Sequence, residues 1–194
     1  MALYRTIIAD PPWDHSDGTG YSFGYRDPRG RSGKHGSSSH SLPYCVMTVA
    51  EICALPVREL AESNATLYLW TTNRYLRQSY DVAEAWGFRP GTMLVWCKPK
   101  NQGLFGGVYL SNVEYVLMAQ RGAPKANGKE GSRWHTWTRG RHSEKPEAFI
   151  DMVERLHSPP YLELFARRNR LGWATWGNEA LNHVQLNVAN KEIM

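Results

Sequence analysis

The sequence predicts an α/β fold in which one sheet carries helices on both faces, and three observations support this class. Short apolar runs alternate along the chain with longer segments whose apolar residues recur at helical spacing. The 194 residues are 42% hydrophobic and 21% charged, as expected for an ordinary globular protein. This length suits a single domain over 1–194, and no internal repeat marks a second one.

The first expected element is a buried strand at 4–10, followed by two prolines and a tryptophan. Neither proline donates to a sheet ladder and each fixes its own φ, so the chain leaves this strand along a rigid, extended path. Residues 14–41 are rich in Gly, Ser and His and lack apolar periodicity, which predicts a long loop. A loop of that length in a compact domain is usually either functional or disordered.

Two helices are expected in the next part of the chain. Residues 48–60 have apolar residues at helical spacing, with Thr48 placed as N-cap and Glu51 three residues later to complete a capping box. Residues 74–88 predict an amphipathic helix that stops at Gly87.

The remaining apolar runs predict strands at 65–72, 92–98, 113–120, 161–167 and 172–178. Residues 121–144 form a second expected loop, and 145–157 a last helix with Pro146 in its first turn. Ligands of such sheets bind beyond the carboxyl ends of the strands. Asp10, Lys98 and Arg167 fall at such ends and are therefore candidate site residues.

Composition limits the function classes and the compartment. A net charge of +5, with eight Trp and ten Tyr, favours a polyanionic partner whose bases stack on aromatic rings. The three cysteines lack a C-x-x-C spacing, which predicts reduced thiols rather than disulfides or a zinc site. Without a signal peptide, a membrane-length apolar run or histidines at ligand spacing, we expect a cytoplasmic protein with no membrane partner and no metal.

The stretch Asp10-Pro11-Pro12-Trp13 carries groups suited to modifying the exocyclic amine of a nucleobase. The lone pair of that nitrogen is delocalised into the ring, so acceptors aimed at its N–H groups favour a pyramidal, more nucleophilic geometry. The Asp10 carboxylate and the carbonyl of Pro11, held rigid by its neighbouring ring, are such acceptors. Trp13 is expected to stack on a base flipped out of its helix. The competing interpretation is a proline-rich turn with a solvent-facing acid and a core tryptophan.

The sequence resembles the MT-A70 family of S-adenosylmethionine-dependent adenine N6-methyltransferases, whose signature is this DPPW tetrapeptide. Further blocks match in family order over nearly the whole chain: LPYCVMTVAEI (42–52), ATLYLWTTNRYL (65–76), AWGFRPGTMLVWCKPKN (85–101), NVEYVLMAQRGAP (112–124), RHSEKPEAFIDMVERL (141–156) and LELFARRNRLGWATWGNE (162–179). The resemblance implies a Rossmann-like class I methyltransferase sheet in permuted order, with the catalytic motif first, and S-adenosyl-L-methionine as cofactor.

The resemblance also implies residue roles. Asp10 would engage the target amine and lie near the methionine end of the cofactor, Pro11 would offer its carbonyl, and Trp13 would shape the base pocket. Lys145 would pair with the cofactor carboxylate. The residues implied to lie beside the target adenine or the substrate are Tyr44 and Glu114. Those implied to bind the ribose and adenine of the cofactor are Arg167, Asn169, Asn178 and Glu179.

The two long loops carry much of the basic charge, which suits attraction to phosphates. The basic residues concerned are Arg26, Arg29, Arg31 and Lys34 in the first loop, and Lys125, Lys129, Arg133, Arg139 and Arg141 in or near the second. Aromatic residues that could stack on bases are Tyr25, Trp134 and Trp137. The alternative is a pair of solvated loops with no partner.

We therefore expect methyl transfer to the N6 amine of adenine in nucleic acid. DNA is favoured, because the compact chain has no added RNA-binding segment and so suits a bacterial or phage enzyme. The alternatives are an RNA N6-adenosine methyltransferase, a non-catalytic nucleic-acid-binding subunit, and a methyltransferase that acts on a small molecule or a protein amine. A monomer or homodimer is expected, and a paralogous partner subunit stays open.

Overall fold

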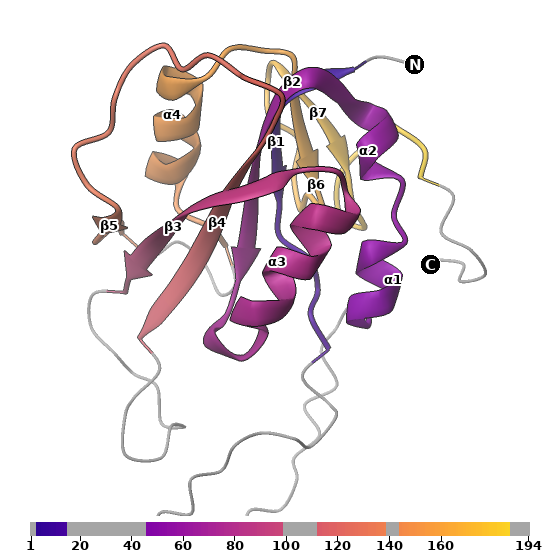
Figure 1. Ribbon diagram of the computed structural model, residues 1–194, viewed down its shortest axis with the longest axis horizontal. Coiled ribbons are helices and arrows are strands. Elements are labelled where there is room, and N and C mark those ends of the chain that lie inside the picture. The colour runs from indigo at the N-terminus through magenta and orange to yellow at the C-terminus, as the bar shows by residue number, and fades with distance from the viewer. Residues whose placement is uncertain (1–2, 15–45, 99–111, 139–143, 187–194) are drawn as a thin grey trace, which may run out of the picture.

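The computed structural model describes residues 3–14, 46–98, 112–138 and 144–186. Its centre is a seven-stranded sheet in the order β5-β3-β4-β2-β1-β6-β7 (Figure 1). The strands are β1 (Tyr4–Ala9), β2 (Ala61–Thr71), β3 (Arg89–Cys97), β4 (Val113–Arg121), β5 (Trp134–His135), β6 (Tyr161–Leu164) and β7 (Trp173–Trp176). β4 runs antiparallel to β2 and β3, and every other pair is parallel. All strands but β4 therefore end at one edge, and β4 begins there.

Helices cover both faces of the sheet, as the sequence predicted (Figure 1). One face carries α1 (Val49–Cys53), α2 (Val57–Leu60) and α3 (Leu76–Ala85), and the other carries α4 (Glu147–Leu156). Successive residues of the central strands alternate between the two layers. Ile7 and Leu69 join the hydrophobic cluster under α1 to α3, whereas Ile8 and Trp70 join the cluster under α4. Both faces of the central strands are therefore buried.

The single helix expected at 48–60 is two short helices, α1 and α2. The expected capping box is present, because Thr48 and Glu51 bond each other's backbone N–H groups. The helix breaks before Pro56, since a proline has no N–H to donate and its ring collides with the carbonyl four residues earlier. That carbonyl, of Ile52, accepts hydrogen bonds from the N–H of Leu55 at 3.2 Å and from the indole N–H of Trp86 at 2.9 Å.

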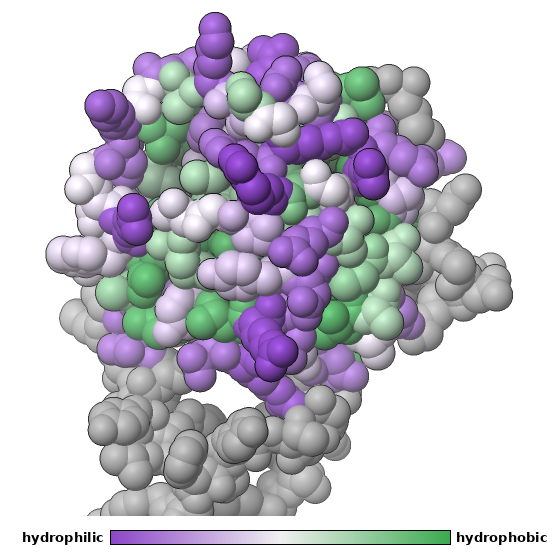
Figure 2. Space-filling view, in the orientation of Figure 1, coloured by the Kyte–Doolittle hydropathy of each residue, from purple (hydrophilic) through white to green (hydrophobic). Residues whose placement is uncertain are grey.

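α3 is amphipathic, as expected. A 3-10 turn, η1 (Asn73–Tyr75), precedes it, and its buried residues are Ser79, Val82 and Ala83. The outer surface of this helix is part of the hydrophilic band on the face shown in Figure 2. Gly87 follows the helix with φ of 80°, a conformation that suits glycine and confirms the expected stop.

Other boundaries differ from the expected ones for local reasons. α4 begins at Glu147 with Pro146 as its N-cap, so Lys145 lies just ahead of the helix. β6 ends at Leu164, because Phe165 has φ of 62° and leaves the strand conformation. The expected loop at 121–144 contains the two-residue strand β5. The expected loop at 14–41 lies outside the described residues except for Asp14.

Within the described ranges, no helix has the length and apolar character needed to cross a bilayer. In the same part of the chain, no group of three or more His, Cys, Asp or Glu side chains is arranged to hold a metal ion.

Candidate active site

Four charged side chains meet at the edge where the parallel strands end. Asp10 directly follows β1 and Lys98 directly follows β3. Glu114 is the second residue of β4, which begins at this edge because it runs antiparallel to its neighbours. Lys145 reaches the same place from the segment ahead of α4. The sheet topology thus brings together residues that are far apart in the sequence.

The four side chains form a chain of ion pairs. Lys145 Nζ lies 2.9 Å from Asp10 Oδ1 and 3.2 Å from Glu114 Oε2. Lys98 bonds the other carboxylate oxygen of Glu114. Lys145 Nζ also lies 4.9 Å from the ring centroid of Trp70, within the range of a cation–π contact. The side chains of Asp10, Glu114 and Lys145 are only 20–26% exposed, so solvent screens these contacts incompletely.

The pairing sets the proton affinities of the cluster. Burial raises the pKa of Asp10, and the nearby Lys145 offsets part of that rise. Burial also pushes the pKa of Glu114 upward, but Lys145 and Lys98 outweigh it and hold this pKa below its ordinary value. Burial lowers the pKa of Lys145, yet the two carboxylates outweigh it and the net shift is upward. Asp10 is therefore a more basic carboxylate than usual whose ionisation depends on Lys145.

The motif that begins at Asp10 is held as a tight turn. The N–H of Trp13 donates to the carbonyl of Pro11 at 2.9 Å, and the carbonyl of Pro12 accepts from the N–H of Met47 at 2.9 Å. Asp14 returns a bond from its N–H to the carbonyl of Met47 at 3.2 Å. Because a carbonyl oxygen has two lone pairs, Pro11 keeps one acceptor position beyond the bond to Trp13.

Trp13 is a core residue, which corrects the expectation that its ring stacks on a flipped base. It is 4% exposed, and its indole N–H donates to the carbonyl of Trp70 at 3.1 Å. Its ring stacks on Tyr75 instead. The competing interpretation of Trp13 as a core tryptophan is therefore right. Its other part, a solvent-facing acid, does not describe Asp10, because Lys145 holds that side chain in the site.

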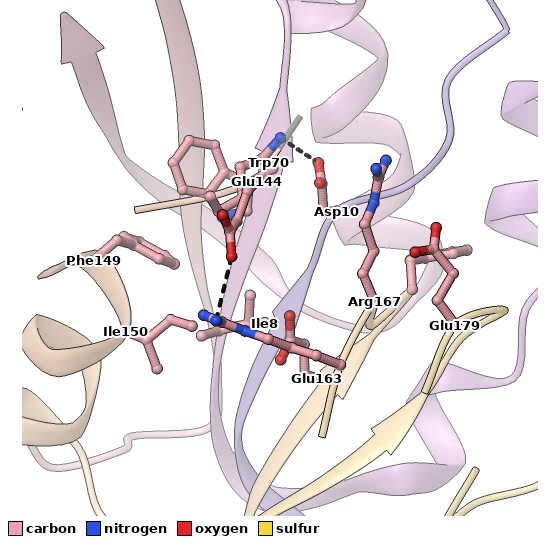
Figure 3. A pocket seen from close by; sticks show the side chains of 12 residues that line it. Ile8, Asp10, Trp70, Glu144, Phe149, Ile150, Glu163, Arg167 and Glu179 are labelled. Carbon is pink, nitrogen blue, oxygen red and sulfur yellow. Dashed lines mark ion pairs between the residues drawn. The ribbon is translucent and has the colours of Figure 1, made fainter. Parts of the chain in front are cut away.

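A cavity of about 290 Å³ opens beside Asp10 (Figure 3). Its lining includes four of the residues implied to bind the cofactor, namely Asp10, Lys145, Arg167 and Glu179. Its apolar part includes Ile8, Trp70, Phe149, Ile150 and Phe165. Glu144 and Arg168 also line the cavity and form an ion pair at 3.3 Å, drawn as a dashed line from Glu144 in Figure 3.

Asn169 and Asn178 lie outside the lining of this cavity. The side chain of Asn169 donates to Thr175 Oγ1 at 3.0 Å and to the carbonyl of Leu181 at 3.3 Å, and it accepts from the N–H of Leu181 at 3.0 Å. These bonds tie the segment after β7 to the sheet, so the side chain of Asn169 bonds within the protein in this structure. Asn178 is exposed.

Only some of the residues expected to contact the substrate or nucleic acid are among those that the structure describes. Tyr44, Arg26, Arg29, Arg139 and Arg141 lie outside the described residues, as do Tyr25, Arg31 and Lys34. Arg133 is exposed beside Trp134, which is itself 63% exposed on the edge strand β5. Trp137, however, stacks on His135 and packs against Phe149, so its ring serves the protein interior.

The turn after β6 is clamped to α4. Arg170 bonds Asp151 at 2.9 Å and Glu154 at 3.0 Å, and it also pairs with Glu147. These three acids lie on one side of α4, at helical spacing, and only the N-cap Pro146 separates this helix from Lys145. The clamp fixes the turn that carries Arg167 and Arg168 against the helix, and so fixes two walls of the cavity relative to each other.

Glu163 is a cavity residue that the sequence analysis missed. It sits in β6 between two buried leucines and is paired in register with Ile8. Burial, together with the charge of Asp10, raises the pKa of Glu163 to about 7, and Arg170 lowers it only in part. The signal available in the sequence is an acid inside an apolar strand, a pattern that Glu114 shares.

We expect Glu163→Gln to stabilise the protein at pH 8 by about 1–2 kcal/mol, and to have little effect at pH 5. Because the folded-state pKa of about 7 lies above the ordinary value of 4.5, stability is lost as pH rises through that window, when the carboxylate must ionise in the cavity. Denaturant unfolding at both pH values, without added ligand, measures the difference. If the free energy of unfolding of the variant differed from that of wild type by the same amount at pH 5 and pH 8, the raised pKa of Glu163 would be contradicted.

The chain matches the MT-A70 family model over residues 4–179. It is 34% identical over 182 residues to the Type II methyltransferase M.MunI of Mycoplasma sp, a match that covers 91% of this chain and 77% of the relative. It is 26% identical to the N(6)-adenosine-methyltransferase MT-A70-like protein of Arabidopsis thaliana, over 96% of this chain and 25% of the relative. It is also 26% identical to the human N(6)-adenine-specific methyltransferase METTL4, over 96% of this chain and 40% of the relative.

The chain therefore spans less than half of the length of these plant and human relatives, but most of the length of M.MunI. The family match covers both the motif at Asp10 and the cavity residues of β6 and β7. These matches show that the chain is a methyltransferase of the MT-A70 family.

Proposed function

We propose that this protein transfers a methyl group from S-adenosyl-L-methionine to the N6 amine of adenine in nucleic acid, with DNA as the favoured polymer. The observation that carries the proposal is the position of Asp10, which ends β1 in a rigid turn, pairs with Lys145 at 2.9 Å and lines a cavity. An acceptor at the mouth of a cavity for the methyl donor is what this reaction needs.

The chemistry of the cavity suits the cofactor. At about 290 Å³ it lies near the lower end of the range for small-molecule sites. The α-amino acid end of the cofactor carries a carboxylate and an ammonium group. Lys145 offers a partner for the carboxylate, and Glu163 offers one for the ammonium. Lys145 has three N–H donors, of which Asp10 and Glu114 take two, so one remains for a carboxylate. Glu179 and Arg167 are the proposed partners of the ribose and adenine.

The bound cofactor would supply an electrophilic methyl group on a sulfonium ion. The residues of this chain prepare the acceptor nitrogen. Asp10 and the remaining lone pair of the Pro11 carbonyl accept the two amine N–H groups, which favours a pyramidal nitrogen. As the N–C bond forms, the methyl–sulfur bond of the cofactor would break with its electron pair left on sulfur, and Asp10 stabilises the positive charge that develops on the nitrogen. The raised pKa of Asp10 makes this carboxylate a better acceptor for the proton that the nitrogen releases.

The names of two relatives bear on whether the substrate polymer is DNA or RNA. The match to M.MunI, which covers most of both chains, supports DNA. The Arabidopsis relative is named an N(6)-adenosine-methyltransferase, and this supports RNA as the second candidate. The proposal includes the basic residues of the two long loops as phosphate contacts, a monomer or homodimer as the active form, and the cytoplasmic location expected from the unpaired thiols.

The test is methyl transfer from labelled S-adenosylmethionine to matched DNA and RNA oligonucleotides, single- and double-stranded, followed by mass-spectrometric mapping of the product. We expect N6-methyladenine in DNA. Transfer to RNA alone would replace the favoured polymer, and transfer to a nucleoside or protein amine would replace the substrate class. Nucleic-acid binding without transfer and without binding of S-adenosylhomocysteine would identify a non-catalytic subunit instead.

A further inference from the structure

We propose that Tyr75 is a positioning residue for the Asp10–Trp13 motif. It fixes the point where the chain leaves the motif, and this keeps Asp10 and the Pro11 carbonyl in the geometry that transfer requires. The inference rests on the proposed function for its kinetic consequence. Its structural consequence, a motif held in place by Tyr75, stands apart from any activity.

The ring of Tyr75 is one layer of a stack that includes the motif. It lies 5.1 Å from the ring of Trp13 with an interplanar angle of 16°. Both side chains are buried, at 7% and 4% exposed. The guanidinium of Arg74 lies 5.6 Å from the Tyr75 centroid. The indole of Trp13 is thus fixed in its plane by the stack and along its edge by the bond to the Trp70 carbonyl.

The hydroxyl of Tyr75 holds the backbone just beyond the motif. It donates to the carbonyl of Asp14. The N–H of Asp14 is itself engaged, since it donates to the Met47 carbonyl at 3.2 Å. Asp14 is therefore tied through both of its backbone polar groups, and Tyr75 supplies a tie at the carbonyl.

The other end of the motif has a weaker backbone anchor. The N–H of Asp10 reaches the carbonyl of Leu164 only at 3.5 Å, the outer limit of a hydrogen bond. The backbone bonds at the exit, at 2.9 and 3.2 Å to Met47, are shorter than this one. Tyr75 is suited to holding the exit because it ends η1, between β2 and α3, and its N–H donates to the carbonyl of Thr72 at 3.0 Å.

Tyr161 provides a matched control at the edge of the sheet opposite to the motif. Its ring stacks on Trp173 at 4.7 Å and 15°, and its hydroxyl donates to the carbonyl of His157 at 2.6 Å. It begins β6, whereas Asp10 follows the end of the neighbouring β1. Tyr75→Phe removes the hydroxyl that bonds the carbonyl of Asp14, and Tyr161→Phe removes the hydroxyl that contacts the carbonyls of His157 at 2.6 Å and Glu154 at 3.5 Å. Each variant keeps an aromatic ring that can stack on its tryptophan, but only the first change touches the motif.

The experiment compares these two variants in methyl transfer, S-adenosylhomocysteine binding and amide hydrogen exchange. We expect Tyr75→Phe to lower kcat about 10-fold, with KM for the cofactor and S-adenosylhomocysteine affinity within about 2-fold of wild type. Amide exchange at Asp14 and Met47 should become at least about 5-fold faster in this variant. Tyr161→Phe should change none of these quantities more than about 2-fold, at a similar loss of thermal stability.

Three results would overturn the proposal: equal losses of kcat in the two variants, unchanged exchange at Asp14 and Met47 in Tyr75→Phe, or faster exchange there without a fall in kcat. If the wild-type protein transfers no methyl group, the proposed function fails and the exchange measurement alone decides whether Tyr75 holds the motif. Tyr75→Leu also removes the stack and should lower kcat about 100-fold, so kcat should fall from wild type to Tyr75→Phe and again to Tyr75→Leu.

Discussion

Asp10→Asn is expected to lower kcat for methyl transfer by at least about 1000-fold while the protein stays folded. The asparagine keeps the size of the side chain but removes the negative charge that would face the developing positive charge on the acceptor nitrogen. It also removes the acceptor for the released proton. Lys145 keeps a partner in this variant, because Glu114 lies 3.2 Å from its Nζ, so no cation is left unpaired in the site.

The measurement is single-turnover methyl transfer at saturating cofactor and oligonucleotide, with thermal unfolding as the check on folding. Glu62→Gln is the matched control, since it neutralises a carboxylate that pairs with Arg5 at 3.0 Å near the starts of β1 and β2, at the opposite end of these strands from the site. We expect this control within about 2-fold of wild type. An Asp10→Asn enzyme that retains a tenth of the wild-type rate would remove Asp10 from the mechanism.

The edge of the sheet that holds the site follows from the sequence, because the strand pattern and the parallel order determine which residues end there. Asp10 and Lys98 lie directly beyond β1 and β3, as predicted. Glu114 lies inside an apolar strand, where a carboxylate needs a partner, and it has two in Lys98 and Lys145. Which cations these would be was not predictable, because contact between β4 and the segment ahead of α4 depends on the packing of the whole layer.

The sequence is less informative about the direction in which a side chain points. Trp13 belongs to the motif, yet its ring packs in the core. Asn169 is implied by the resemblance to bind the cofactor, yet its side-chain amide is hydrogen-bonded to Leu181 and Thr175. A residue type reveals what bonds are available and not which neighbour takes them. Glu163 shows the converse, since its environment in the cavity, and with it a pKa near 7, arises only when β6 lies beside β1.

Replacing Lys145 should have the largest effect on the pH dependence of the reaction. In Lys145→Met, Asp10 and Glu114 lose the cation between them, and we expect kcat/KM to fall by about 100- to 1000-fold at pH 7. Burial already raises the pKa of Asp10 and Lys145 lowers it, so removing Lys145 raises that pKa further. Transfer requires the ionised carboxylate, so the acid limb of the rate profile should move to higher pH, with part of the rate recovered near pH 9.

Stability should also fall at high pH, because burial would then raise the pKa of Asp10 without the opposing charge of Lys145, while Glu114 keeps Lys98 as a partner. The folded form of Lys145→Met should therefore weaken relative to wild type as pH rises above the ordinary carboxyl pKa of about 4. Lys145→Arg keeps the positive charge beside Trp70 and should leave the acid limb within about half a pH unit of wild type. Rate profiles from pH 5 to 9 on the three proteins measure both effects. An acid limb that stays in place in Lys145→Met would mean that this lysine does not govern the ionisation of Asp10, and the ion-pair chain would then have no part in activating the acceptor.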